Sequence, residues 1–104
     1  MYFAVVARDR VGVAELRSRL RPEHRAWLRQ PGNHPIMVRL GGPVLAPDGA
    51  MDGTLLVVEA ENELAVRAFL ADDPYCRNDL FAHLEVRQWQ WSLGQPEAEM
   101  VGGK

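Results

Sequence analysis

Four segments of the chain carry the alternating or continuous apolar side chains that are typical of β-strands. Residues 2–7 are apolar on both alternating sets of side chains, which indicates a strand buried on both faces, at the centre of a sheet. The segments 36–45 and 54–59 also resemble strands, and the Pro-Asp-Gly sequence between them predicts a hairpin with a loop. Residues 84–93 alternate strongly and predict the last strand.

Two further segments have the spacing of an amphipathic helix. Between residues 13 and 28 the apolar side chains recur on one face of a helix that turns by about 100° per residue. Pro22 lies inside this run and removes a backbone donor, so we expect either a kink or two short helices, the second beginning at the proline. Residues 62–71 predict another helix with Asn62 as its N-cap, and a short helical turn is expected around residues 75–80.

The order β-α-β-β-α-β predicts a ferredoxin-like α+β domain over residues 1–94, with a four-stranded antiparallel sheet. Two helices cover one face of such a sheet, whereas the strands carry large apolar side chains on both faces. An open apolar face is unfavourable in water, so we expect a second copy of the chain to cover it in a homodimer. Trp89 and Trp91 are assigned to this interface. The segment 95–104 has no apolar period and is expected to be mobile or to lie over the partner.

The composition is that of one folded domain. Of the 104 residues, 47% are hydrophobic and 25% are charged, which is far from the composition of disordered chains. A formal net charge of −2 argues against nucleic acid as the main partner, because duplex binding depends on clustered basic residues. Several arginines nevertheless lie between Arg17 and Arg29. We interpret them mainly as the solvated side of a helix, with attraction of an acidic ligand as the alternative.

The sequence carries few signals of location or of cofactors. The single cysteine, Cys76, excludes an internal disulfide, which is compatible with a reducing cytosol. The first apolar run reaches Arg8 before a signal sequence or membrane span would be complete, so a cytoplasmic protein is expected. The histidines and the cysteine lack the close spacing of zinc sites, and no phosphate-binding glycine loop or dinucleotide fingerprint occurs. We therefore expect no metal and no nucleotide cofactor.

His24 is the leading candidate for chemistry. If the first helix continues through Pro22, His24 lies between Leu20 and Leu28 in the middle of the apolar face and points inward. A partly buried imidazole can accept and donate a proton near neutral pH, which suits a general base. The alternative is a structural histidine that donates to a backbone carbonyl in the core, and the residue pattern alone favours that alternative.

Arg17 and Asp73 are the candidate partners of His24. Arg17 lies two turns earlier on the same helix face and could bind a carboxylate or phenolate, or pair with an acidic residue at the surface. Asp73 precedes a proline and could simply cap the short helix that follows. It could also orient the His24 ring, and because a carboxylate has two oxygens the two roles are compatible.

Four more residues are candidates for substrate binding. Gly42 and Pro43 follow Gly41 in a strand, which suggests a bulge or the close approach of a ligand to the backbone, with a bent edge strand as the alternative. Trp27 and Tyr75 could form an aromatic wall for a flat substrate, or could belong to the core as large aromatic residues usually do.

Together these residues resemble the YciI-like (YCII-related) family. The resemblance spans about residues 1–94 and rests on the arginines, histidine and tryptophan of segment 17–28, the Gly-Gly-Pro in a strand, the Asp-Pro-Tyr at 73–75 and the final Arg-x-Trp-x-Trp. It implies a dimeric α+β barrel in which His24 and Asp73 match the family's histidine and aspartate at a small cleft. The best-defined activity that it implies is that of a dehydrochlorinase acting on a chlorinated aromatic compound.

The leading hypothesis is therefore a small, cofactor-free, homodimeric enzyme in which His24 and Asp73 perform acid/base chemistry on a small aromatic or enol-like compound. Elimination or isomerisation fits best, because each needs one positioned base and a dry cleft. Arg17 would hold an anionic group of the substrate. The alternative is a non-catalytic module that binds a small molecule in the same cleft. A purely structural dimerisation domain is disfavoured by the matched histidine and aspartate.

Overall fold

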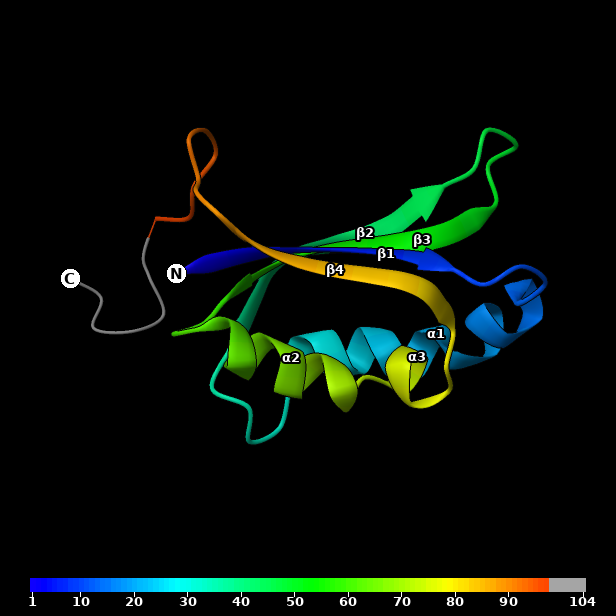
Figure 1. The fold of residues 1–104 in the computed structure, drawn as a ribbon, viewed down its shortest axis with the longest axis horizontal. Helices are drawn as coiled ribbons and strands as arrows, with labels where there is room; N and C mark the ends of the chain where they lie inside the picture. The colour runs from blue at the N-terminus through cyan, green and yellow to red at the C-terminus, as the bar shows by residue number, and fades with distance from the viewer. Residues whose placement is uncertain (98–104) are drawn as a thin grey trace.

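A computed structural model describes residues 1–97 of the chain. Its elements in chain order are β1 (Tyr2–Asp9), α1 (Ala14–Arg29), β2 (Met37–Leu45), β3 (Met51–Glu59), α2 (Glu63–Ala71), α3 (Pro74–Arg77) and β4 (Phe81–Trp89). The predicted β-α-β-β-α-β order is confirmed, with α3 as the short helical turn expected before the last strand (Figure 1). None of the helices within residues 1–97 combines the length and the apolar character that crossing a bilayer requires.

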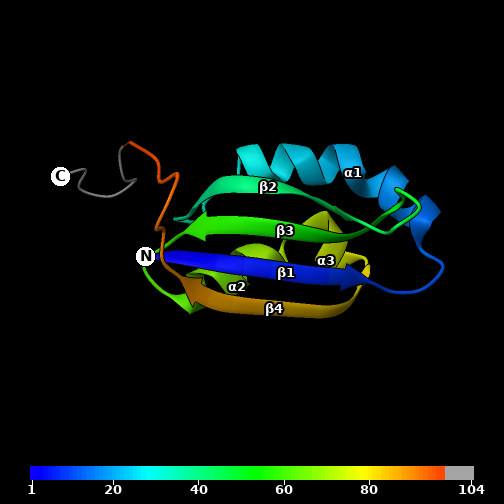
Figure 2. The same ribbon diagram turned by 90° about the horizontal axis from the view of Figure 1, so that it is seen from above.

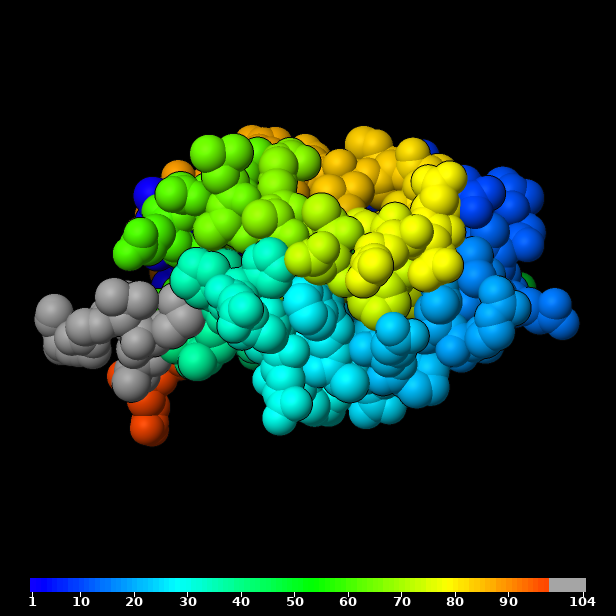
Figure 3. Space-filling view, turned by 90° about the horizontal axis from the view of Figure 1, so that it is seen from below, coloured from blue at the N-terminus to red at the C-terminus, as the bar shows by residue number. Residues whose placement is uncertain are grey.

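The four strands form one antiparallel sheet in the order β2-β3-β1-β4. Because β1 pairs with β3 on one side and β4 on the other, the central position predicted for the first strand is confirmed. The helices all pack on the same face of the sheet (Figures 1 and 2). Figure 3 shows them side by side as one layer over that face. This is the ferredoxin-like α+β fold that the pattern predicts.

The core lies between the sheet and α2. Val5, Leu56 and Val86 are in register across three strands and are buried on the face that the helices cover. Val66 and Phe69 of α2 belong to the same cluster of buried side chains. Burying one such side chain contributes about 1.5–3 kcal/mol. This packing fixes α2, and with it the start of α3, which follows α2 directly.

The other face of the sheet is open in the single chain. It carries large apolar side chains that remain well exposed: Val6 is 44% exposed, Leu40 54% and Leu55 48%. The prediction that the first strand is buried on both faces is therefore wrong for the chain by itself, because all the helices pack on one side. The covering of this open face by a second copy stays a prediction.

Helix α1 is a single helix that continues through Pro22, so the alternative of two short helices is wrong. Its first turns incline away from the axis of the later turns (Figure 2), as expected where a proline removes a hydrogen bond from a helix interior. The buried residues of α1 are Arg17, Leu20 and His24. The inward orientation predicted for His24 is therefore confirmed.

The last strand, β4, ends at Trp89, which pairs with Tyr2 at the beginning of β1. The strand predicted over 84–93 starts and ends too late, because Phe81 already pairs with Asp9 and β1 offers no partner beyond Tyr2. Trp91 lies outside the strand, with its ring centroid 4.8 Å from that of Trp89. The shared strand face predicted for the two tryptophans is therefore wrong. Most of the segment 95–104, predicted to be mobile, lies outside the described residues.

Candidate functional site

His24 and Asp73 form a buried hydrogen-bonded pair. The Nδ1 atom of His24 lies 2.9 Å from each carboxylate oxygen of Asp73, and both side chains are almost fully buried. An ionised carboxylate only accepts hydrogen bonds, so Nδ1 carries the proton in this contact. The other ring nitrogen, Nε2, makes no hydrogen bond within the described part of the chain, and His24 lines a pocket. Its lone pair is therefore available on the pocket side.

The backbone of α3 holds Asp73 in place. Asp73 is the N-cap of this helix, and its Oδ1 accepts a hydrogen bond from the backbone N–H of Tyr75 at 2.9 Å. Pro74 occupies the first position of the helix, where a missing N–H leaves nothing unpaired. The carboxylate thus caps the helix and binds the histidine at once, which explains why one aspartate satisfies both interpretations of the sequence.

Tyr75 forms the wall behind the histidine. Its ring stacks on the His24 imidazole with centroids 3.9 Å apart and an interplanar angle of 14°, and the residue is fully buried. Burial raises the pKa of the Tyr75 hydroxyl, an effect that the positive charge of Arg17 partly offsets. The phenol therefore stays protonated near neutral pH. The tyrosine restricts the imidazole to one plane and faces the same pocket.

Arg17 is a buried anchor of the site. Its Nε and Nη2 atoms bind the Asp9 carboxylate at 2.7 and 2.9 Å, and both side chains are about 5% exposed or less. Nη2 also donates to the carbonyl of Gly53 and the hydroxyl of Thr54, so the guanidinium joins α1 to β1 and β3. Burial acts to lower the pKa of Arg17, but the hydrogen bond and charge of Asp9 outweigh it and leave the pKa raised. Arg17 therefore stays charged, and its charge is neutralised by Asp9.

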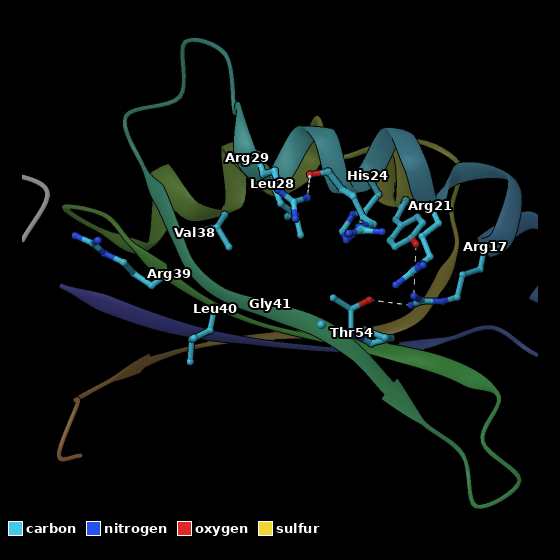
Figure 4. A pocket seen from close by; sticks show the side chains of 14 residues that line it. Arg17, Arg21, His24, Leu28, Arg29, Val38, Arg39, Leu40, Gly41 and Thr54 are labelled. Carbon is cyan, nitrogen blue, oxygen red and sulfur yellow. Dashed lines mark hydrogen bonds between the residues drawn. The ribbon is translucent and has the colours of Figure 1, made fainter. Parts of the chain in front are cut away.

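A pocket of about 390 Å³ lies between α1 and the edge strand β2 (Figure 4). This volume lies within the range of about 300–1,000 Å³ that is typical of sites for small organic molecules. Five of the residues predicted from the sequence line it: Arg17, His24, Gly42, Pro43 and Tyr75. Asp73 is not among the lining residues, because it lies behind His24 as the partner of Nδ1.

Trp27 does not line this pocket. Its ring stacks on Phe69 of α2, with centroids 5.6 Å apart and an angle of 7°, and its indole nitrogen donates to the backbone carbonyl of Phe69. The His34 ring packs against the same indole in a T-shaped arrangement, with an interplanar angle of 82°. Trp27 therefore belongs to the contact between α1 and α2, as the core alternative for large aromatic residues proposed, and Tyr75 alone supplies the aromatic wall.

The Gly-Gly-Pro segment lies in an edge strand, and the register of that strand with β3 shifts on both sides of it, between Val38 and Leu40 and between Val44 and Leu45. A Cβ atom on Gly41 would lie 2.9 Å from the side chain of Leu56 and 3.5 Å from that of Leu28. A Cβ atom on Gly42 would meet nothing within 4 Å. The missing side chain at Gly41 thus keeps the pocket floor open, a role that the sequence reasoning did not give it.

Arginines surround the histidine, and the sequence pattern was interpreted mainly as a solvated helix side, with attraction of an acidic ligand as the alternative. Arg21, Arg25 and Arg29 of α1 line the pocket, as do Arg39 of β2 and Thr54 of β3. The three helix arginines follow Arg17 at four-residue intervals, and this spacing was the available signal, since it keeps side chains along one side of a helix. The pocket therefore has a strongly cationic wall next to His24.

The other titratable groups of the described residues form no comparable site. His34 binds Asp72 at 2.8 Å, but Asp72 is more than half exposed and neither residue lines the pocket. Burial raises the pKa of the Cys76 thiol to about 11, which makes it a poor nucleophile at neutral pH. Within residues 1–97, no group of three or more His, Cys, Asp or Glu side chains could hold a metal ion.

The chain is therefore a small ferredoxin-like α+β protein with a pocket lined by a histidine. The family model of the YCII-related domain matches residues 1–90, so the chain belongs to this family, and the resemblance seen in the sequence is confirmed. No curated protein is significantly similar to the chain in sequence.

Solved structures agree with this assignment. The chain is similar to 5-chloro-2-hydroxyhydroquinone dehydrochlorinase (TftG) from Burkholderia phenoliruptrix AC1100 in complex with 2,5-dihydroxybenzoquinone, with 30% identity and a TM-score of 0.75 over 86% of this chain and 94% of that one. It shares its fold with an antibiotic biosynthesis monooxygenase-like protein from Bacteroides thetaiotaomicron, with 16% identity and a TM-score of 0.58 over 96% and 94% of the two chains. A Mycobacterium tuberculosis protein gives 15% identity and a TM-score of 0.52 over 90% and 100%.

Proposed function

We propose that the protein is an enzyme that transfers protons on a small aromatic or enol-like compound without a cofactor. The observation that carries this proposal is the buried contact between His24 and Asp73, which leaves one imidazole nitrogen free at a pocket. In this role His24 is the catalytic base and acid. Asp73 is a positioning residue that fixes the ring and stabilises the imidazolium form.

The reaction that fits best is elimination or isomerisation. The Nε2 atom of His24 takes a proton from an enol hydroxyl or from a saturated carbon of the substrate's keto tautomer, and the electron pair of the broken bond to hydrogen forms a new double bond. In an elimination, the bond between a saturated carbon of this tautomer and a halogen breaks, the halide leaves with the electron pair of that bond, and the proton on Nε2 passes to water. In an isomerisation the same nitrogen returns the proton to another atom of the substrate. Neither sequence needs a redox partner.

The other lining residues have supporting roles in this proposal. The Tyr75 ring keeps the imidazole in one plane, and the backbone of Gly42 and Pro43 forms the opposite wall for a flat ligand. Arg17 lies at the side of the pocket that carries the Tyr75 hydroxyl, and the Nη1 atom of Arg17 is 3.5 Å from the phenol oxygen. The partly enclosed, partly apolar cavity limits the access of water to the proton in transfer.

Because TftG is a dehydrochlorinase of 30% identity, its substrate is the first compound to test. Chloride release from 5-chloro-2-hydroxyhydroquinone would be measured with the wild type, with His24→Gln and with His34→Gln. His34 is a matched control, since it also pairs with an aspartate but lies outside the pocket. We expect His24→Gln to lower the rate by about 10²–10⁴-fold, the usual contribution of a general base. Equal rates in the two variants would contradict the proposal.

A non-catalytic binding module is the alternative, and the cationic pocket wall is the observation that favours it, since that wall can hold a ligand without any proton transfer. The two functions differ in what His24 contributes. A binding module keeps its ligand affinity when His24 is replaced by Gln and shows no turnover in the wild type. An enzyme loses turnover in the same variant while ligand affinity changes little.

We also propose that the protein is a cytoplasmic homodimer whose subunits meet through the open face of the sheet. Val6, Leu40, Val44 and Leu55 expose apolar surface on this face. Exposed apolar patches of this kind are usually covered in soluble proteins, and a symmetric second copy is the commonest cover. In the cytoplasm the free thiol of Cys76 would stay reduced.

A further inference from the structure

The charge of the pocket differs from the charge of the chain. Of the fourteen residues that line the pocket, five are arginines and none is an aspartate or a glutamate. The chain as a whole has a formal net charge of −2. The excess of positive charge is therefore local to this cavity. The low-dielectric walls of the cavity strengthen the electric field that acts on a bound ligand.

Two of the five arginines have their charge neutralised by a buried carboxylate. Arg17 binds Asp9, and Arg39 binds Glu59 at 2.7 Å. An anion in the pocket would compete with these buried pairs, which are held by short hydrogen bonds. Arg17 is therefore not the residue best placed to recognise an anionic ligand.

The other three arginines are not compensated within residues 1–97. Arg21 and Arg25 form no ion pair there, and the hydrogen bond of Arg29 goes to the backbone carbonyl of Arg25 at 3.3 Å. Their four-residue spacing brings like charges next to one another on the helix, an arrangement that is repulsive in the absence of a ligand. Binding an anion would relieve that repulsion.

Solvation of a helix side does not by itself explain why Arg21, Arg25 and Arg29 follow one another on the pocket side of α1. The side of α1 that faces away from the pocket carries charges of both signs, with Glu15, Arg19 and Glu23. The pocket side carries arginines alone, next to the catalytic His24 (Figure 4). Segregation of one sign of charge to the wall of a cavity points to a ligand of the opposite sign.

We propose that Arg21, supported by Arg25 and Arg29, is the anion-recognition element of this pocket, and that the ligand is a small ring compound with a negative charge on oxygen, such as a carboxylate or phenolate. This inference rests on the proposed function in taking the pocket as the substrate site. Arg21 is partly buried and lies three residues, about 4.5 Å along the helix axis, before His24. A charged group bound to Arg21 therefore brings the ring beside the imidazole.

Arg25 and Arg29 have a different role in anion binding. Both are exposed, so they lie where the pocket meets solvent. Charges in that position attract an anion over a distance set by the ionic strength and raise its rate of entry more than its residence time. Arg21 sets the affinity of the bound state, because a charge-assisted hydrogen bond is strongest in a partly dehydrated site.

Benzoate and benzamide test this assignment, since they have nearly the same shape and differ in charge. Their dissociation constants would be measured by NMR titration on the wild type, on Arg21→Gln and on Arg19→Gln. Arg19 is the matched control, an exposed arginine of the same helix that does not line the pocket. We expect the wild type and Arg19→Gln to bind benzoate about tenfold or more tightly than benzamide, and Arg21→Gln to lose most of that preference.

Equal affinity for the two probes in the wild type would overturn the proposal, as would absence of benzoate binding or an unchanged preference in Arg21→Gln. The same titration on His24→Gln separates this inference from the proposed function. Retention of the benzoate preference in that variant is expected, because the anion contact does not depend on the base. If turnover proves independent of His24, the proposed function is wrong, and the binding data alone then decide whether Arg21 recognises an anion.

Discussion

The carboxylate of Asp73 binds the Nδ1 atom of His24 at 2.9 Å and caps helix α3 through the backbone N–H of Tyr75 at the same distance. One side chain thereby links the orientation of the histidine to the start of a helix that packs against α1. Because Pro74 follows, the cap position is fixed by the chain itself. The pair is a property of the fold, and His24 does not need a ligand to adopt this position.

Asp73→Asn is expected to abolish most activity without unfolding the protein. Asparagine caps helices as well as aspartate, so its carbonyl oxygen can keep the bond to Tyr75. Its amide NH₂ then faces Nδ1 of His24 and donates to it, which moves the ring proton to Nε2 and removes the base from the pocket. We expect a loss on the order of 10²–10⁴-fold in turnover, as for the equivalent change in other orienting aspartates.

Asp72→Asn serves as the control for that variant, because Asp72 pairs with His34 outside the pocket and is mostly exposed. Its turnover should match that of the wild type within about twofold, a change of less than about 0.5 kcal/mol. Similar losses in the two variants, with unchanged melting temperatures, would show that Asp73 does not act through His24.

Arg17→Met should destabilise the protein severely. The substitution leaves the Asp9 carboxylate buried without a partner and removes the bonds to Gly53 and Thr54. Breaking a buried ion pair from one side costs about 3–5 kcal/mol in the free energy of unfolding. Urea denaturation of the wild type and of Arg17→Met measures this difference in the free energy of unfolding.

Arg67→Met provides the comparison, since Arg67 forms an exposed pair with Glu63 one turn away on α2. Such a surface pair is worth about 0.3–0.5 kcal/mol. A loss below about 1 kcal/mol for Arg17→Met would mean that the Asp9 contact is not a stabilising anchor.

Gly41→Ala and Gly42→Ala should differ in stability although the residues are neighbours. An alanine Cβ at Gly41 approaches Leu56 to 2.9 Å, so the side chain beneath the pocket must move, at about 1–3 kcal/mol. At Gly42 the new methyl meets nothing within 4 Å, and reduced freedom of the unfolded chain gives a gain of about 0.4–1 kcal/mol. Thermal unfolding compares the two, and equal melting temperatures would contradict the assignment of Gly41 to the pocket floor.

Alkaline conditions should weaken the fold through Cys76. Burial raises the pKa of its thiol from 9.0 to about 11, so the unfolded chain loses this proton at a lower pH than the folded chain does. A raised pKa contributes stability below the unfolded value, and this contribution is lost as pH rises from about 9 to about 11. The free energy of unfolding should fall over this window, and less steeply in Cys76→Ala. An identical slope in the variant would assign the effect to other groups.

The dimer has its own test. Light scattering should give about twice the chain mass of 11.7 kDa for the wild type. Leu55→Glu places a charge in the centre of the open sheet face and should give monomers, because burying an unpaired carboxylate is strongly unfavourable. Leu64→Glu is the control, since Leu64 is 79% exposed on α2, on the opposite side of the sheet. A monomeric wild type would contradict the proposed homodimer.

The sequence predicted the fold well because the apolar periods of strands and helices are local properties of the chain. Element order, the central first strand and the inward face of His24 all follow from such periods. The ends of β4 do not, since they depend on where the partner strand β1 stops. Burial of side chains on the open face of the sheet likewise depends on what covers that face. The alternation of apolar and polar residues does not specify the cover.

Within the site, local patterns predicted some residues and not others. The Asp-Pro sequence indicated a cap, and the helix spacing placed Arg17 and His24 on one face. Trp27 shares that apolar spacing, yet its contact with Phe69 arises from the packing of two helices, which only the three-dimensional structure reveals. The arginines after Arg17 were interpreted mainly as solvated, with an acidic ligand as the alternative, because sequence spacing does not show that strand β2 closes a cavity in front of them.

The central claim is that Asp73 holds the proton on Nδ1 of His24, so that Nε2 is a free base at the pocket. Nitrogen-15 NMR of the imidazole, recorded at a pH where the ring is neutral, tests it most directly because the two tautomers give different nitrogen shifts. The expected result is the Nδ1–H tautomer in the wild type and the Nε2–H tautomer in Asp73→Asn. An Nε2–H tautomer in the wild type would contradict the claim, since the nitrogen at the pocket would then be a donor and not a base.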